Sequence, residues 1–198
     1  IGFETYQRIL DEALEELRET EFKDLYKSDP THEHPKEWKP GTTDCHIETD
    51  MEILLPDSYV SNTAERIKLY RELDNISKFE ELDKFKTELR DRFGILPVQV
   101  EDLLSIVQLR WLAVSLGFEK IILKNEMLFG YFISNQLSSY YRSSIFMQIM
   151  QYIQRNPNRY KIKEGKEKLS LTITNIKNID EAIYQLQQIN NSLRLNES

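Results

Sequence analysis

The chain of 198 residues is long enough for one domain of ordinary size, or for one domain with an appended element. Hydrophobic residues make up 40% and charged residues 30%, which is a globular composition and excludes a wholly disordered chain. The net charge of −7 repels a phosphate backbone unless the basic residues are segregated, so generic nucleic-acid binding is disfavoured.

The sequence carries no pattern typical of export or membrane insertion. No apolar run approaches the roughly 20 residues that a membrane helix needs, and the N-terminus lacks a basic stretch followed by an apolar one. The single cysteine, Cys45, cannot form an internal disulfide, which suits a reducing compartment. We therefore expect a cytoplasmic protein without membrane contacts. The chain begins with Ile1 instead of Met, which suggests a piece of a longer protein.

Two segments precede the predicted globular part. Apolar residues between Phe3 and Leu17 recur at helical intervals, so residues 1–25 are predicted to form an amphipathic helix with an acidic outer face. Residues 26–45 carry three prolines and no periodic apolar pattern, which is typical of an extended linker. Zinc needs three or four ligands that converge tetrahedrally, and the spacing of the ligand-type side chains here matches no familiar zinc pattern. We therefore predict no metal site among His32, His34, Cys45 and His46.

The pattern after the linker predicts one strand and then three helices. Apolar and polar residues alternate over 46–55, which is typical of a half-buried strand ended by a proline. Helical spacing of apolar residues follows in three stretches up to residue 116. Three kinds of signal mark the predicted helix boundaries. They are the capping pairs Asn62 with Glu65 and Ser77 with Glu80, a proline at a helix start, Pro97, and the helix-ending glycines Gly94 and Gly117.

The remaining residues predict two hairpins, each followed by a helix. Asn125-Glu126 joins two short apolar runs, and Gly165 separates two alternating segments. The helix after the first hairpin is predicted to begin at Ser138 or Ser139, and the last helix at Asn178. Segregated helices and hairpins indicate an α+β domain over residues 46–198, with helices packed on short antiparallel strands and hairpins.

No catalytic constellation is recognisable. The chain has no Gly-x-x-x-x-Gly-Lys-Ser/Thr phosphate loop and no Gly-x-Ser-x-Gly elbow, and its histidines lie in or beside the linker. Glu48 and Asp50 point the same way from the predicted strand, which is the ordinary pattern of solubilising charge on a sheet surface. We predict no catalytic residue in this chain.

A basic region lies between residues 142 and 168, which contain seven basic and two acidic residues with tyrosines interleaved among them. Such a region can grip phosphates and stack on bases. Lysines that protect an exposed strand edge from aggregation give the same pattern, so both interpretations stay open. The candidate nucleic-acid contacts are Arg142, Arg155, Arg159, Lys161 and Lys163.

The helix predicted between Ser77 and Gly94 has an apolar stripe and a charged stripe on different sides. Its apolar residues recur at spacings of three and four along one face, which is predicted to lie against the core: Phe79, Leu82, Phe85, Leu89 and Phe93. The charged residues either form local pairs one turn apart or make a mixed-charge surface for a partner of complementary pattern. They are Glu81, Lys84, Glu88, Asp91 and Arg92.

Four segments of this sequence resemble, in order, those of the C-terminal domain of the bacterial transcription-repair coupling factor, an ATP-driven DNA translocase. IGFETYQRILDEAL is similar to the segment leaving the second motor lobe of that family. LLPDSYVSNTAERIKLYREL resembles the family's Pro-x-x-Tyr stretch and the helix with Arg-x-x-x-Tyr. ELRDRFGILP resembles its Glu-Leu-x-Asp-Arg-Phe-Gly-x-x-Pro signature, and LRWLAVSLGFEKI resembles the helix and hairpin that follow this signature. The resemblance covers about two thirds of the chain.

The resemblance implies a non-catalytic regulatory domain over 46–198 that holds no cofactor, whereas ATP and Mg would bind the motor of the parent protein. In that family the domain folds back on an N-terminal module resembling UvrB, covers the surface that binds UvrA and restrains the motor. RNA polymerase and double-stranded DNA would contact other parts of the parent. The resemblance assigns Glu88, Asp91 and Arg92 to the internal interface, and we extend it to Glu81 and Lys84.

Overall fold

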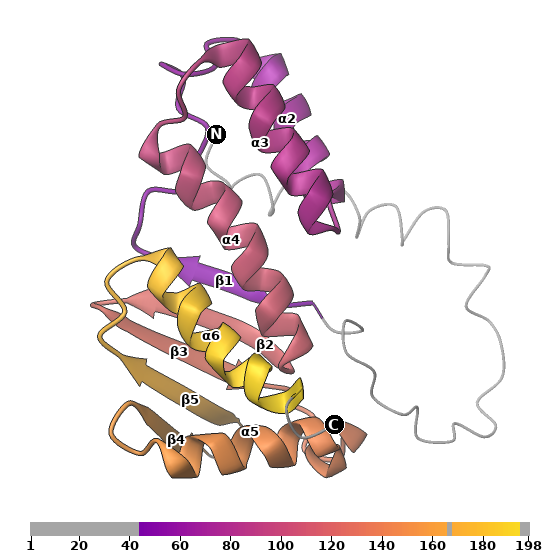
Figure 1. The fold of residues 1–198 in the computed structure, drawn as a ribbon, viewed down its shortest axis with the longest axis vertical. Coiled ribbons are helices and arrows are strands. Elements are labelled where there is room, and N and C mark those ends of the chain that lie inside the picture. Colours follow the sequence, from indigo (N-terminus) through magenta and orange to yellow (C-terminus); the bar gives the residue numbers. More distant parts are fainter. Residues whose placement is uncertain (1–43, 166–167, 195–198) are drawn as a thin grey trace, which may run out of the picture. The chain divides into compact units, whose positions relative to one another are not determined.

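The computed structural model describes residues 44–165 and 168–194 (Figure 1). The helix predicted over 1–25 and the linker up to residue 43 lie outside the described residues. The described part divides into two compact units, one built from residues 52–104 and the other from residues 44–51 and 105–194. An α+β fold is confirmed, with helices and a five-stranded sheet.

The first unit is helical. It contains α2 (Thr63–Asn75), α3 (Phe79–Phe93) and the first turns of α4 (Val98–Ser115). The predicted cap of α2 is confirmed, because the Asn62 side chain accepts a hydrogen bond of 3.0 Å from the backbone N–H of Glu65.

The predicted start of α3 is wrong in its details. Lys78, not Ser77, occupies the N-cap position, and no side chain caps the helix there. Instead, the Glu81 carboxylate reaches back and accepts a hydrogen bond of 3.2 Å from the backbone N–H of Ser77. Phe79, predicted on the apolar face, is 61% exposed, because it lies at the first helical position, ahead of the buried stripe. The end at Gly94 is as predicted, with φ of 89°.

The second unit contains the sheet. Its strands are β1 (His46–Thr49), β2 (Phe118–Lys124), β3 (Met127–Phe132), β4 (Tyr160–Glu164) and β5 (Leu169–Thr174), in the spatial order β1-β2-β3-β5-β4. Both predicted hairpins are present, and Asn125 and Glu126 turn the first with positive φ. The sheet is not wholly antiparallel, because β1 pairs in parallel with β2.

Strand β1 is shorter than the predicted strand over 46–55. It pairs with β2 only as far as Thr49, opposite Leu123, and one further bond joins Asp50 N–H to the Leu123 carbonyl at 3.3 Å. Strand β2 ends at Lys124, where the hairpin turns, so no partner strand remains for the residues after Asp50.

The predicted cap at Ser138 is present, but the helix that it begins is short and a second helix follows it. Ser138 caps a short 3-10 helix, η1 (Ser139–Arg142), and Ser143 then caps α5 (Ser144–Arg155). Two serine caps in succession split what the sequence predicts as one helix. The last helix, α6 (Ile179–Arg194), begins as predicted, because Asn178 accepts a hydrogen bond of 2.8 Å from Glu181 N–H.

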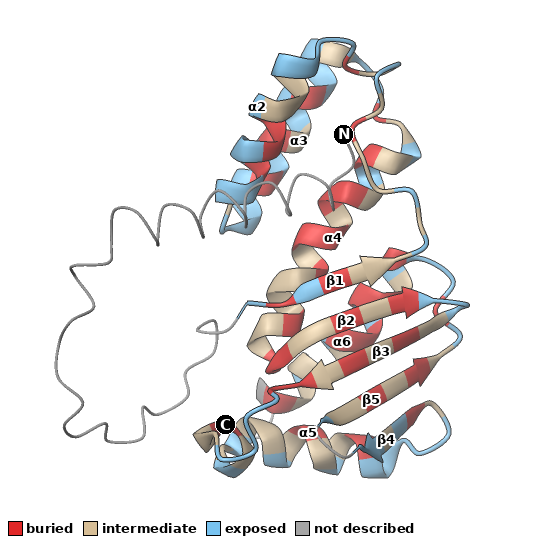
Figure 2. Ribbon diagram, turned by 180° about the vertical axis from the view of Figure 1, so that it is seen from behind, coloured by how far each residue is buried: buried red, intermediate tan, exposed pale blue. Residues whose placement is uncertain are grey.

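One face of the sheet carries the helices. The second half of α4 and α6 lie in front of the strands in Figure 1 and behind them in Figure 2. Along β3, Leu128, Gly130 and Phe132 are buried on this side, whereas alternate residues are half-buried on the other. The core therefore lies between the sheet and these helices.

Gly117 ends α4 at a crowded point of this core. It has φ of 81°, and an added Cβ would lie 2.2 Å from the Tyr140 ring. That ring is fully buried, and its hydroxyl donates to the Leu116 carbonyl at 2.5 Å. Both the backbone conformation and the space at this position therefore require glycine.

We predict that Gly117→Ala destabilises the second unit by about 2 kcal/mol or more, because left-handed strain adds to overpacking. Urea denaturation monitored by circular dichroism measures this. Gly94→Ala is the matched control, since Gly94 also has positive φ but no atom within 4 Å of an added Cβ, so its cost is strain alone. Equal unfolding midpoints for Gly117→Ala and the parent chain would contradict the packing described here.

Candidate functional site

Helix α3 is held in the first unit by the predicted apolar stripe. Leu82, Phe85 and Leu89 are 3%, 3% and 1% exposed, respectively. Because these three side chains lie at spacings of three and four, their burial fixes the rotation of α3 about its axis.

The five charged residues predicted as an interface are all exposed on α3. At 100° per residue they cover about 100° of the helix circumference, so they form one continuous strip along its length. We call this strip the α3 stripe: Glu81, Lys84, Glu88, Asp91 and Arg92.

Two ion pairs organise the α3 stripe. Lys84 Nζ lies 3.6 Å from Glu88 Oε1, one turn along the helix. Arg92 Nη2 lies 2.6 Å from Oε1 of Glu65 on α2, and its guanidinium is 4.8 Å from the centre of the Phe93 ring. The hydrogen bond from Arg92 lowers the pKa of Glu65 below its ordinary value of 4.5. Arg92 and Glu88 are therefore each paired within this unit and remain about half exposed, at 48% and 47%, and Asp91 is exposed as well.

Tyr59 ties the segment before α2 to the end of α3. Its hydroxyl lies 3.0 Å from the Leu89 carbonyl and 3.1 Å from the Gly94 carbonyl, and its ring packs at 5.7 Å from that of Phe93. Burial raises the pKa of Tyr59, so the phenol keeps the proton that it donates. Carbonyls at a helix C-terminus lack partners within the helix, and Tyr59 supplies one.

The helix α2 holds the same segment from its other side. Arg66 Nη1 donates to the Val60 carbonyl at 2.6 Å, and the Tyr70 hydroxyl accepts a bond of 2.8 Å from Leu55 N–H. The motifs Pro-x-x-Tyr and Arg-x-x-x-Tyr thus join the segment before α2 to α2 and to the end of α3. Sequence reasoning did not find these roles, since the partners of Tyr70 and Tyr59 lie 15 to 35 residues away and no local pattern indicates the Arg66 contact.

The basic residues predicted for nucleic acid do not form one patch. Arg142 ends η1 and Arg155 ends α5, so the 12 residues of α5, about 18 Å of helix, separate them. Arg159 is half-buried and pairs with Glu181 of α6. Lys161 and Lys163 are exposed on β4 and share one face of the sheet, because alternate strand residues point the same way.

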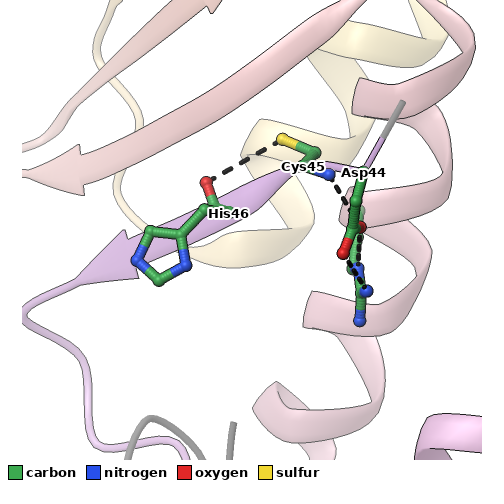
Figure 3. Close-up of polar contacts among 4 residues, drawn as sticks. Asp44, Cys45 and His46 are labelled. Carbon is green, nitrogen blue, oxygen red and sulfur yellow. Dashed lines mark hydrogen bonds and ion pairs between the residues drawn. The ribbon is translucent and has the colours of Figure 1, made fainter. Parts of the chain in front are cut away.

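No metal-binding group of three or more side chains is present in the described residues, and His32 and His34 lie outside them. Cys45 is buried, and its sulfur points to the opposite side of the chain from the His46 ring (Figure 3). Burial raises the pKa of the Cys45 thiol to about 12, which leaves it protonated and unreactive. Asp44 is bound by Arg110 through two bonds of 2.9 and 2.8 Å.

Comparison with known proteins matches residues 49–143 to the TRCF domain. This range includes Tyr59, the helix α2 and the whole α3 stripe. Residues 49–143 belong to the TRCF domain family. The resemblance seen in the sequence motifs is thereby confirmed.

Relatives in several bacteria support the same assignment. The chain is 31% identical over 186 residues to the transcription-repair-coupling factor of Rickettsia prowazekii, an alignment that covers 94% of this chain and 15% of the relative. It is 30% identical over 151 residues to that of Haemophilus influenzae, covering 76% of this chain and 12% of the relative. The chain therefore spans a small part of the length of these relatives.

The fold matches that of a solved structure, the crystal structure of a C-terminal domain of transcription-repair coupling factor. The TM-score is 0.62 at 20% sequence identity, and the match covers 76% of this chain and 92% of the other. No helix in the described residues has the length and hydropathy needed to cross a bilayer.

We predict that Tyr59→Phe lowers the free energy of unfolding by about 0.5–1.5 kcal/mol, because the ring still packs on Phe93 while the hydroxyl contact to the end of α3 is lost. Urea denaturation measures the change. Tyr184→Phe, which alters a side chain that is 54% exposed, is the control and should be neutral. An unchanged midpoint for Tyr59→Phe would show that the hydroxyl does not support α3.

We also predict that Arg92→Ala returns the pKa of Glu65 towards 4.5, because its main hydrogen-bond donor is removed. Because the pKa of Glu65 is lower in the folded state than in the unfolded state, the pair stabilises the fold at pH values above the unfolded-state pKa of Glu65. This contribution is lost as the pH falls through the folded-state pKa of Glu65. Carbon NMR titration of the Glu65 carboxyl measures it, with Lys84→Ala as the control. An identical pKa in Arg92→Ala and the parent chain would contradict the pairing.

Proposed function

We propose that this chain is a non-catalytic regulatory domain of a transcription-repair coupling factor. In this proposal residues 46–198 form the domain, residues 26–45 are its linker, and residues 1–25 are the helix that leaves the motor of the parent protein. The domain docks through the α3 stripe on the parent's N-terminal UvrB-like module in the cytoplasm. Docking masks the surface for UvrA and restrains the ATP-driven motor.

The observation that carries this proposal is a mixed-charge strip on a helix whose rotation is fixed by buried side chains. Charges held on a rigid element keep their pattern, so a complementary surface can match it without an ordering cost. Glu88 and Asp91 extend into solvent, and the family resemblance assigns them to the internal interface.

Exposed apolar side chains next to the stripe support a docking role. Ile95 and Val98, which follow α3, are 91% and 64% exposed. Interfaces combine charged groups, which set orientation, with apolar groups whose burial supplies affinity. These two side chains, which follow the C-terminal end of α3, are therefore the expected apolar anchors.

Regulation would follow from linkage. If the domain binds the UvrB-like module only in the resting state, any ligand that prefers the released state shifts the population towards release. UvrA and this domain would compete for overlapping surface. Engagement of RNA polymerase and DNA by other parts of the parent would favour the released state. Tethering within one chain raises the effective concentration, so docking does not need high intrinsic affinity.

The test is the double reversal Glu88→Lys with Asp91→Lys, assayed for binding to the separately expressed N-terminal module of the parent. We expect at least a tenfold loss of affinity with unchanged circular dichroism, because both side chains are exposed and their reversal places like charges opposite each other.

The matched control is Glu80→Lys with Asp83→Lys, which makes the same charge change at two other exposed positions of α3. It should bind like the parent chain. Equal loss in both double variants would mean that net charge, and not the α3 stripe, governs binding. Unimpaired binding of the Glu88/Asp91 variant would reject the proposed interface.

A further inference from the structure

The sheet has a second face that none of the described helices of the second unit covers (Figure 2). We call it the open face. It is formed by the strand residues that alternate with the buried ones, and it lies wholly within the second unit.

Strand register sets the side chains of the open face in rows. In one row Tyr131 lies between Lys120 on β2 and Ser170 on β5, and Lys163 on β4 follows. In the next row Phe129 lies between Ile122 and Thr172, followed by Lys161. Each row thus has an aromatic ring on the central strand and a lysine at the β4 edge.

The two rings form a platform at the centre of the sheet. Phe129 and Tyr131 are two residues apart on β3, the third of the five strands, so they lie about 6.8 Å apart along it. Both are half-buried, which keeps part of each ring accessible. Aromatic rings on an uncovered sheet are surfaces on which unpaired bases stack.

Positive charge surrounds this platform. The strands carry Lys120, Lys124, Lys161 and Lys163 on the open face, and Glu48 on the edge strand β1 adds a carboxylate there. Glu48 pairs with Lys120 at 2.6 Å and therefore neutralises part of the positive charge on the β1 and β2 side of the sheet. The protein as a whole is acidic, so the lysines are segregated here against the net charge of −7.

Edge protection does not account for this arrangement. Lysines that discourage aggregation are expected on edge strands such as β4. Lys120 and Lys124, however, lie on β2, which is inside the sheet between β1 and β3. An acidic peptide would satisfy the lysines and leave the two rings unused. Phosphates joined to flat bases match both features together.

We propose that the open face binds single-stranded nucleic acid, with bases stacked on Phe129 and Tyr131 and phosphates held by Lys161, Lys163 and Lys124. This proposal is independent of docking through the α3 stripe. It keeps Lys161 and Lys163 of the basic region of residues 142–168, but it leaves out Arg142, Arg155 and Arg159, which lie off the open face.

The experiment is fluorescence anisotropy of the 198-residue chain with a labelled 12-nucleotide thymidine strand. With three phosphate contacts, binding should weaken about tenfold when salt rises from about 50 to about 150 mM. Lys161→Glu with Lys163→Glu should weaken it at least tenfold at the lower salt. Phe129→Leu, which keeps an apolar side chain without a ring, should weaken it about fivefold or more with an unchanged salt dependence.

Arg142→Glu with Arg155→Glu is the matched control, since it makes the same charge change off the open face, and it should bind within twofold of the parent chain. A duplex of the same length should bind more weakly, because its bases are not free to stack, and polyglutamate should compete poorly.

Several results would overturn the proposal. These are no binding at the lower salt, equal losses in the two charge-reversal variants, full binding by Phe129→Leu, duplex binding as tight as the single strand, or polyglutamate competing as well as the oligonucleotide.

Discussion

The burial of Leu82, Phe85 and Leu89 is the constraint on which the candidate interface depends. Three side chains on one side of α3 enter the core of the first unit, and the helix can then present its charged residues in one way only. The contact of Tyr59 with the carbonyls at the end of α3 fixes the helix terminus as well. The α3 stripe is therefore part of a rigid element, as a surface that must recognise one partner requires.

The sheet of the second unit follows the same physical rule with a different period. Burial of alternate side chains under α4 and α6 turns the intervening residues outward, which gathers Phe129, Tyr131 and the lysines on the open face. In both units the apolar pattern decides where the polar chemistry is displayed. Docking of a protein module and binding of a single strand are thus separate proposals on separate units.

Local signals predicted most of the elements and failed where the decisive contact was distant. The caps at Asn62 and Asn178 and the turn at Asn125-Glu126 each involve residues within three positions of one another, and all three were predicted correctly. The Ser77–Glu80 box was wrong, because Ser and Glu at that spacing are compatible with more than one helix start. The length of β1 was wrong because it is set by the end of its partner strand.

The candidate site divides in the same way. Exposure of the α3 stripe follows from the spacing of its neighbours, so periodicity alone predicted it. The Arg92–Glu65 pair spans 27 residues, and the contacts of Tyr59 span 30 and 35, so no local pattern indicates them. The rows of the open face likewise depend on the order β1-β2-β3-β5-β4, which hairpin signals do not determine.

In the proposed function, this domain and UvrA exclude each other from one surface. A titration of UvrA into a complex of this chain with the parent's N-terminal module measures this exclusion. We expect UvrA to displace the chain, and we expect the apparent affinity of UvrA to fall in proportion to the concentration of the chain once that concentration exceeds the dissociation constant of the chain for the module. A ternary complex in which UvrA and the chain occupy the module together would contradict it.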